Sequence, residues 1–251
     1  MTGNELLLAA YRNMCCVQYM AETYERNRAV CKYVHSTSRG HEAIQLAAAF
    51  QLKPHDAVSP YYRDESILLG LGFTPYQLML QLLAKKDDIF TGGREYYSHP
   101  NYRGSDKPLI IHQSSATGMQ AIPTTGIAQG FQYLAQIRSP LLPQTDGVVL
   151  CSLGDASVTE GEVSEAFQFA VLKKLPVIYL VQDNNWGISV TAEEARCMNA
   201  VEYAAGFKGM NTIQVDGSDF TASYEVMKQV VNDVRKNRRP WLVHARVPLL
   251  G

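Results

Sequence analysis

Two polar residues stand where apolar strands are expected to end. Asp155 follows the run "VVLCSL" and is flanked by Gly154 and Ala156. Asn184 comes 29 residues later, just after the run "VIYLV". One carboxylate and one carboxamide oxygen suit Mg²⁺, which takes few protein ligands and completes its shell with water and substrate phosphates. The small neighbours of Asp155 would let a diphosphate approach the backbone, so these residues predict a Mg²⁺–diphosphate site.

A purely local role for Asp155 is the simpler alternative. Asp155 would then begin the turn, or it, Ser157 or Thr159 would cap the following helix. For the second position, Asn185 is the alternative to Asn184.

Alternating strands and helices must position these residues. Strands are expected at 147–153, 177–182, 212–217 and 241–249, and helices at 122–137, 159–174, 201–209 and 221–237. This alternation predicts an α/β fold, a parallel sheet with helices on both faces. Because parallel strands share a direction, Asp155 and Asn184 should lie at the same edge of the sheet, where open α/β sheets bind ligands.

The N-terminal part of the chain reads as a helical segment followed by an irregular one. Helices are expected at 4–27, 41–52 and 74–88, whereas residues 89–113 show no period and are rich in Gly, Pro, Tyr and Arg. Such a long irregular segment is typical of a functional loop. In the helix at 122–137, Gly126, Ala128 and Gly130 allow close packing. We expect residues 1–251 to form a single domain.

The composition is that of a soluble globular protein. Of the 251 residues, 46% are hydrophobic and 19% charged, and the net charge of −1 argues against nucleic-acid binding. Five cysteines without a C-x-x-C pair indicate free thiols rather than disulfides or a zinc site. There is no signal-peptide layout and no apolar run of the about 20 residues that span a bilayer, so we expect a cytoplasmic protein without a membrane partner.

Several segments together resemble a known enzyme family. "GDA" followed by "DNNWGIS" resembles the thiamin diphosphate motif, usually G-D-G and then N-N after a spacer. Four further segments match in family order: "PYYRDESILLGLG", "GGREYYSH", "SSATGMQAIPTTGIAQG" and "VDGSD". Over about residues 5–250, the chain resembles the alpha subunit of the thiamin diphosphate-dependent 2-oxo acid dehydrogenases, the decarboxylating component.

The resemblance implies a set of cofactor and metal ligands. The side chains of Asp155 and Asn184 and the backbone carbonyl of Trp186 would bind Mg²⁺. The cofactor-binding residues would be Tyr62, Arg63, Ser114, Ser115, Thr117, Gly118, Gly154, Asp155, Ala156 and Asn184. Arg63 would contact the diphosphate, the alternative being a surface ion pair with Asp64 or Glu65. Gln120 would support a monovalent-cation site.

The histidines divide into one candidate and several structural residues. His99 either faces the substrate channel, as a family histidine does, or is a solvated loop residue. We expect structural or surface roles for His35, His41, His55, His112 and His244. The main catalytic histidine of the family is expected beyond Gly251, with the chain truncated at its C-terminus relative to the family.

The resemblance also implies a reaction and partners. The thiamin carbanion would attack a 2-oxo acid, carbon dioxide would leave, and the acyl group would pass to the lipoyl arm of an acyltransferase component. A beta subunit, separate or fused, would complete a heterotetramer of two alpha and two beta chains and supply a glutamate to the cofactor. Ser114 and Ser115 favour a branched-chain 2-oxo acid.

Four alternatives remain beside this interpretation. They are a pyruvate or acetoin dehydrogenase alpha subunit, a non-catalytic half that binds its partner, a transketolase-type enzyme and a nucleotide-binding Rossmann domain. Transketolases usually carry both halves in one long chain and lack the "YYR…GGR" segments. The absence of a G-x-G-x-x-G motif argues against the Rossmann domain.

Three departures from the family pattern limit the transfer of roles. "GDA" replaces "GDG", one extra residue lies near Ala121, and Gln182 stands where some relatives have a second phosphate-binding arginine.

Overall fold

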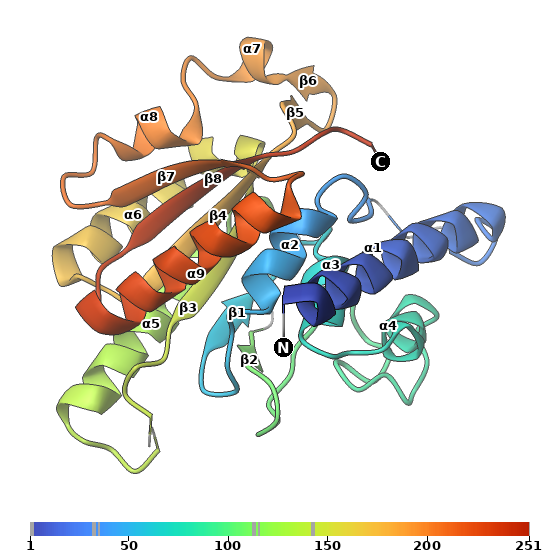
Figure 1. The fold of residues 1–251 in the computed structure, drawn as a ribbon, viewed down its shortest axis with the longest axis horizontal. Helices are drawn as coiled ribbons and strands as arrows, with labels where there is room; N and C mark the ends of the chain where they lie inside the picture. The colour runs from blue at the N-terminus through green and yellow to red at the C-terminus, as the bar shows by residue number, and fades with distance from the viewer. Residues whose placement is uncertain are drawn as a thin grey trace.

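A six-stranded parallel sheet forms the centre of the computed structural model, which describes residues 3–31, 34, 36–111, 114, 116–141 and 144–250 (Figure 1). Its strands are β1 (Ala57–Ser59), β2 (Leu109–Ile110), β3 (Val149–Gly154), β4 (Val177–Asp183), β7 (Asn211–Asp216) and β8 (Trp241–Arg246). They lie in the order β2-β1-β3-β4-β8-β7, and every pairing is parallel. A separate antiparallel ribbon pairs β5 (Trp186–Gly187) with β6 (Val190–Thr191).

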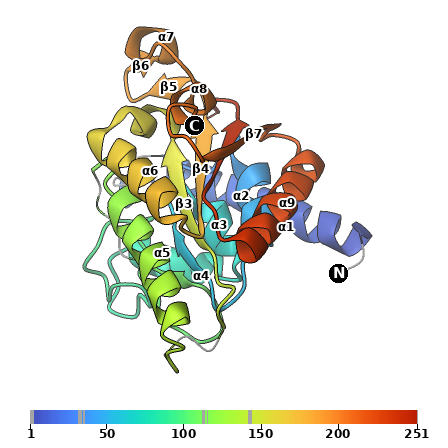
Figure 2. The same ribbon diagram turned by 90° about the vertical axis from the view of Figure 1, so that its left-hand side faces the viewer.

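Helices cover both faces of the sheet (Figure 2). One face packs against α5 (Ala121–Gln136), α6 (Gly161–Lys173) and α8 (Ala200–Ala204). The other packs against α2 (Glu42–Ala49), α3 (Glu65–Gly70) and α9 (Phe220–Asn237), and α1 (Gly3–Arg26) packs on α2 and α3. Within β3, Cys151 faces the first group and Leu150 the second, and both are fully buried. The strand is therefore buried on both faces and largely apolar, and its buried polar residue, Ser152, is hydrogen-bonded to Gln182.

The predicted fold class is confirmed, but three predicted helices are too long. The helix expected at 41–52 is α2, which ends at Ala49. The helix expected at 74–88 is α4 (Pro75–Leu82). It ends there because Ala84 takes a left-handed backbone (φ 49°) and the carboxylate of Asp88 accepts bonds from backbone N–H groups of the next turn. The helix expected at 201–209 is only α8, and Gly209 beyond it has φ 110°.

The elements that the sequence missed are the short ones. They are β1, β2, α3, the β5–β6 ribbon and α7 (Ala192–Ala195). None is long enough to show a helical or strand period over the windows that carry this signal. In addition, a 3-10 turn over Asp155–Thr159 precedes α6, which begins at Gly161.

Two composition-based predictions can be compared with the structure. All five cysteines are free thiols, as expected. Among the described residues, no helix combines the length and apolar character required to cross a membrane.

Candidate functional site

The strand order reverses at β1, because β2 lies on one side of β1 and β3 on the other. Such a reversal opens a crevice at the carboxyl ends of the strands. Tyr61 lies on the β1 side of this crevice, and its hydroxyl accepts a hydrogen bond from Ser157 Oγ at 3.1 Å. A Cβ at Gly154 would lie 3.3 Å from the Tyr61 ring, so the glycine gives the ring room at the end of β3.

Asp155 and Asn184 follow neighbouring strands, as predicted. The register of β3 and β4 pairs Gly154 with Gln182, which places the next residues of both strands at one edge. Asp155 is 3% exposed and begins the 3-10 turn. The capping alternative is wrong, because α6 begins after Glu160 without a side-chain cap.

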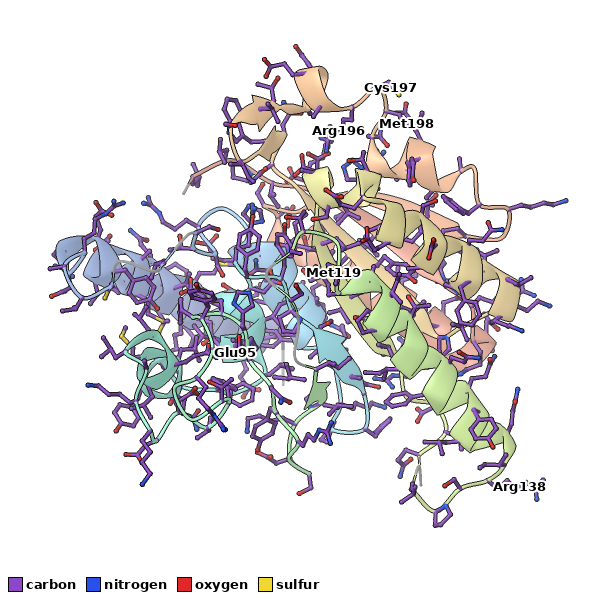
Figure 3. The ribbon with its side chains drawn as sticks, turned by 180° about the vertical axis from the view of Figure 1, so that it is seen from behind. Glu95, Met119, Arg138, Arg196, Cys197 and Met198 are labelled. Carbon is purple, nitrogen blue, oxygen red and sulfur yellow. The ribbon has the colours of Figure 1, made fainter. Side chains whose placement is uncertain are left out.

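The carboxylate of Asp155 is bound by an arginine that the sequence did not single out. Arg196 Nη1 lies 2.7 Å from Asp155 Oδ2, and Arg196 Nη2 lies 2.9 Å from Asp183 Oδ1. His244 Nε2 in turn lies 2.7 Å from Asp183 Oδ2. His244 is therefore structural, as expected, but part of this cluster. Figure 3 shows Arg196 above the carboxyl end of the sheet.

The two aspartates differ in their electrostatics. Burial, and then the negative charge of Asp183, raise the pKa of Asp155 to about 6, although Arg196 opposes this. Burial also raises the pKa of Asp183, but hydrogen bonds from His244, the Asn185 backbone N–H and Arg196 outweigh it and lower that pKa. Asp183 is thus the stable anion of the pair, and Asp155 carries the unfavourable charge.

Asn184 is buried, whereas Asn185 is exposed with a left-handed backbone (φ 63°). Asn184 Oδ1 accepts a bond from the backbone N–H of Trp186 at 3.1 Å. The β5–β6 ribbon then folds over the 3-10 turn. A Cβ at Gly187 would lie 2.8 Å from Cβ of Ala156, so this position requires glycine. The geometry supports Asn184 over Asn185 as the candidate ligand.

Residues 116–120 approach the same turn from another side. Gly118 has φ 83°, and a Cβ there would lie 2.9 Å from Cβ of Glu160. Thr117 beside it is partly buried, and Ser114 is exposed. Ser115 lies outside the described residues, as do His35 and His112.

Gln120 is committed to the sheet. Its side chain is buried, and its Nε2 donates to the Ser152 carbonyl at 2.9 Å. Because Nε2 is already used, Gln120 could bind a monovalent cation only through its oxygen atoms.

Arg63 is held in place beside the adjacent rings of Tyr61 and Tyr62. Its guanidinium lies 5.2 Å from the centre of the Tyr62 ring, and Nη2 donates to the Tyr62 hydroxyl at 2.9 Å. Asp64 and Glu65 are buried and bonded to other groups, so the structure does not support an ion pair with Arg63. Among the described residues, the buried Arg63 Nε has no hydrogen-bond partner. This leaves a donor available to an anion.

A buried network of hydrogen-bonded polar side chains lies next to Arg63 and contacts it through His41. Gln182 is 1% exposed, and its Oε1 accepts from His41 Nδ1 at 2.9 Å and from Gln45 Nε2 at 2.8 Å. Its Nε2 donates to Asp64 Oδ1 and Ser152 Oγ, both at 2.8 Å. Gln182 is thus fully bonded inside the protein, which explains a glutamine at this position.

His41 is a positioning residue within this network. Burial, and then the charge of Arg63, lower the pKa of His41 to about 4. The neutral ring donates from Nδ1 to Gln182 and presents Nε2 to Arg63 Nη1 at 3.4 Å. No pattern in the sequence indicated this role, because the network joins residues that are far apart along the chain.

His99 is 4% exposed, so the solvated-loop alternative is wrong. Its Nδ1 contacts the Tyr97 carbonyl at 3.0 Å, and its own carbonyl accepts from Gln81 Nε2. A direct role toward substrate stays a prediction. The remaining histidine, His55, pairs with Asp146 at 3.0 Å away from the site.

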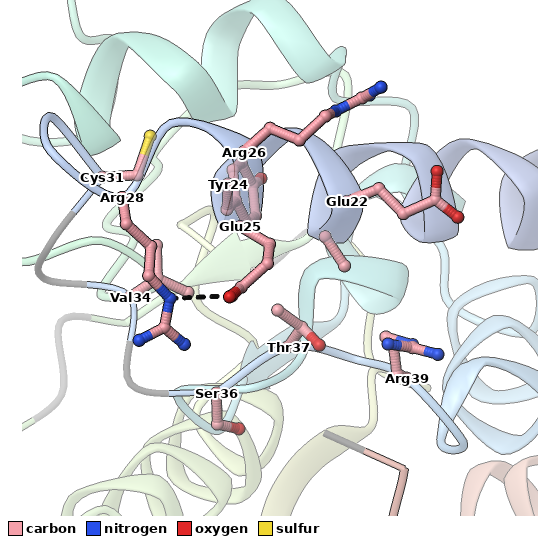
Figure 4. Close-up of a pocket in the computed structure, with 11 residues that line it drawn as sticks. Glu22, Tyr24, Glu25, Arg26, Arg28, Cys31, Val34, Ser36, Thr37 and Arg39 are labelled. Carbon is pink, nitrogen blue, oxygen red and sulfur yellow. Dashed lines mark hydrogen bonds and ion pairs between the residues drawn. The ribbon is translucent and has the colours of Figure 1, made fainter.

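A cavity of about 590 Å³ lies between the end of α1 and residues 34–39 (Figure 4). Its lining includes Arg26, Arg28 and Arg39, and Arg28 pairs with Glu25 at 2.8 Å. None of its described lining residues belongs to the predicted cofactor site.

The donor set at the sheet edge fits Mg²⁺–diphosphate. Asp155, Asn184 and the Trp186 carbonyl offer only hard oxygen ligands, which Mg²⁺ prefers. The described residues contain no group of three His, Cys, Asp or Glu that could hold a metal alone. The predicted Mg²⁺ site is not such a group, because it has one carboxylate, one carboxamide and one backbone carbonyl as ligands. The unpartnered Arg63 Nε and the crevice at Gly154 fit the phosphate part.

Comparison with known proteins shows which family this chain belongs to. The family model described as dehydrogenase E1 component matches residues 9–247. The 2-oxoisovalerate dehydrogenase subunit alpha of Bacillus subtilis is 32% identical over 207 residues, which cover 82% of this chain and 59% of that protein. The pyruvate dehydrogenase E1 component subunit alpha of Acholeplasma laidlawii is 29% identical, covering 91% of this chain and 59% of that protein. A 2-oxoisovalerate dehydrogenase alpha subunit of Arabidopsis thaliana, named mitochondrial, is 27% identical, and the match covers 99% of this chain and 50% of that protein. The chain thus spans about half to three fifths of the length of these relatives.

Solved structures show the same fold at lower identity. Transketolase from Campylobacter jejuni has a TM-score of 0.58 and 20% identity, covering 81% of this chain and 32% of that chain. A putative thiamin diphosphate-dependent enzyme from Mycobacterium smegmatis has a TM-score of 0.51 and 17% identity, covering 86% and 33%. These likenesses concern the fold alone. The match over residues 9–247 decides the family: the chain belongs to the dehydrogenase E1 component family, as a relative of the alpha subunits of 2-oxo acid dehydrogenases.

Proposed function

We propose that the chain is the diphosphate-binding alpha part of a thiamin diphosphate-dependent 2-oxo acid dehydrogenase. It would decarboxylate a 2-oxo acid, with branched-chain acids favoured, and pass the acyl group to a lipoyl arm. One observation carries the proposal: oxygen ligands after β3 and β4 and an aromatic-held arginine after β1 lie at one edge of the sheet. The branched-chain preference is supported by relatives named 2-oxoisovalerate dehydrogenase.

The residues of this chain would bind and orient the cofactor. Asp155, Asn184 and the Trp186 carbonyl would hold Mg²⁺. Tyr62 and Arg63 would bind the diphosphate, and Gly118 and Gly154 would give it access to the backbone. When bound, thiamin diphosphate supplies the nucleophile and the electron sink for decarboxylation, and the protein supplies orientation and electrostatics.

The test is carbon dioxide release by the full chain assembled with its beta half. Pyruvate and 3-methyl-2-oxobutanoate would be compared, with and without thiamin diphosphate and Mg²⁺. Cofactor-dependent release favouring the branched acid would support both family role and substrate, and release favouring pyruvate would overturn only the substrate. No release from an assembled complex would favour the non-catalytic alternative.

Arg63→Ala is expected to weaken thiamin diphosphate binding by about 1.5–3 kcal/mol, the value of a hydrogen bond to a charged group. The reason is the available Nε donor and the fixed guanidinium. Isothermal titration with Mg²⁺ present would measure the loss, and Arg138→Ala, at an exposed site just beyond the C-terminal end of α5, is the control. Unchanged affinity in Arg63→Ala would remove Arg63 from the site.

The exposed face of α5 is the surface we propose for the beta half. Spaced along this face are Ile122 (42% exposed), Gly126, Gly130, Tyr133 (59%) and Ile137 (54%). At helical spacing they lie within one stripe. A Cβ at either glycine would meet no atom within 4 Å, so the described packing of this chain does not require them. Glycine is unfavourable inside a helix, and close approach of a partner chain would explain the presence of two glycines in α5.

Gly126→Leu is therefore expected to leave the chain folded but to weaken assembly with the beta half by about fivefold to 150-fold, because interface overpacking costs about 1–3 kcal/mol. Analytical ultracentrifugation of the mixed subunits would measure assembly. Gln168→Leu, at an exposed position of α6, is the control. Equal assembly of both variants would place the beta half elsewhere.

Three narrower proposals accompany this function. Residues 1–251 would form one domain, supported by the single main sheet with core clusters on both faces. A monovalent cation near Gln120 and a cytoplasmic location stay predictions. Relatives from Arabidopsis thaliana and Caenorhabditis elegans are named mitochondrial.

A further inference from the structure

Arg196 bridges the two carboxylates at the candidate metal site. It follows α7, and its side chain is only 10% exposed. One guanidinium nitrogen binds Asp155 at 2.7 Å and the other binds Asp183 at 2.9 Å. A single +1 group thus lies between two carboxylates whose charges repel each other.

The segment that carries Arg196 is otherwise weakly attached to the protein. No residue of α7 is buried, and Ile188 (93% exposed) and Met198 (41% exposed) lie on either side of it. Asn185 and Ile188 have left-handed backbones, with φ 63° and 54°. Such conformations are unfavourable for side chains with a Cβ, above all for a β-branched isoleucine. The two ion pairs of Arg196 therefore tie a strained, exposed segment to the edge of the sheet.

A divalent cation at Asp155 would neutralise the negative charge of this carboxylate, as Arg196 does. It would also repel the guanidinium, since both are positive and would share one carboxylate at a distance of a few ångströms. The buried site leaves little water to screen this repulsion. Because Arg196 already binds Oδ2 of Asp155, a cation at the same carboxylate would weaken that ion pair and be weakened by it.

We propose that Arg196 and the divalent cation compete for Asp155. In the metal-free chain Arg196 neutralises both carboxylates, and cation binding releases Asp155 from Arg196 and loosens residues 192–199. This inference rests on the proposed function, because it assumes that Asp155 binds the cation of thiamin diphosphate.

The test uses Mn²⁺ as the probe, with the full chain, its beta half and saturating thiamin diphosphate. Electron paramagnetic resonance of free Mn²⁺ measures binding without any activity assay. Arg196→Gln is expected to bind Mn²⁺ about tenfold more tightly than the parent, because a nearby positive charge is gone. Arg138→Gln, an exposed site far from Arg196 in Figure 3, is expected to match the parent.

Thermal unfolding of the same proteins separates competition from a merely structural role. Without cation, Arg196→Gln should melt at a lower temperature than the parent, because two carboxylates lose their counter-ion. With saturating Mn²⁺ the difference should become smaller, because the cation then neutralises Asp155 in both proteins and only the ion pair with Asp183 is lost in the variant. A structural residue would give the same difference in both conditions, and that result would overturn the proposal.

Amide hydrogen exchange of the parent needs no variant. Exchange in residues 192–199 should become faster on Mn²⁺ binding, and slower exchange would contradict release. Weaker or unchanged Mn²⁺ affinity in Arg196→Gln, with normal binding by the parent, would overturn this inference alone. No Mn²⁺ binding by the parent would overturn the proposed function and this inference with it.

Discussion

Replacing Asp155 by alanine is expected to abolish Mg²⁺-dependent thiamin diphosphate binding while the chain stays folded. Asp155 is the only carboxylate in the predicted ligand set, so its loss removes the charge that holds the metal. We expect at least about a hundredfold weaker binding, or about 3 kcal/mol. The fold should survive because burial already disfavours this carboxylate, as its raised pKa of about 6 shows. Arg196 keeps its ion pair with Asp183.

Isothermal titration with thiamin diphosphate and Mg²⁺ would measure this loss, with circular dichroism to establish folding. Asp155→Asn keeps the size of the side chain and should show a similar loss, which isolates the charge. Glu165→Ala, which removes an exposed carboxylate of α6, should bind normally. Binding by Asp155→Ala as tight as in the parent would show that the metal assignment is wrong.

Replacing Asp56 by alanine is expected to cause a large loss of stability. Its side chain is 0% exposed and pairs with Arg235, which is 9% exposed. The carboxylate also accepts bonds from the backbone N–H groups of Val148 and Lys53, at 2.8 and 2.6 Å. Removing one partner leaves a buried guanidinium without a counter-ion, which costs about 3–5 kcal/mol.

Urea denaturation would give the change in the free energy of unfolding. The control is Glu225→Ala, which breaks an exposed pair with Lys228 and should cost no more than about 0.5 kcal/mol. A loss below about 1 kcal/mol in Asp56→Ala would indicate that the guanidinium is rehydrated, since buried unpaired charges cost more. The cavity of about 580 Å³ that Arg235 lines would be the route for that water.

The long elements could be predicted from the sequence because their patterns repeat. The helices at 4–27 and 221–237 differ from α1 and α9 by one residue at most at each end. The buried strands β3 and β4 appear as short, mostly apolar runs rich in Val, Ile and Leu, and their length favours strands over helices. Short elements such as β1 and α3 carry no repeating pattern, and tertiary packing decides them.

The sequence by itself determined the family, the α/β alternation and the candidate ligands Asp155, Asn184 and Arg63. Each of these features can be recognised within a short continuous segment, such as "GDA", "DNNWGIS" or "YYR". Only the tertiary structure showed that Arg196 neutralises Asp155 and that Gln182 and His41 back Arg63. His41 and Gln182 are 141 residues apart, and Asp155 and Arg196 are 41 apart. Which buried charge meets which partner depends on how the strands pair, and no pattern within one segment contains that information.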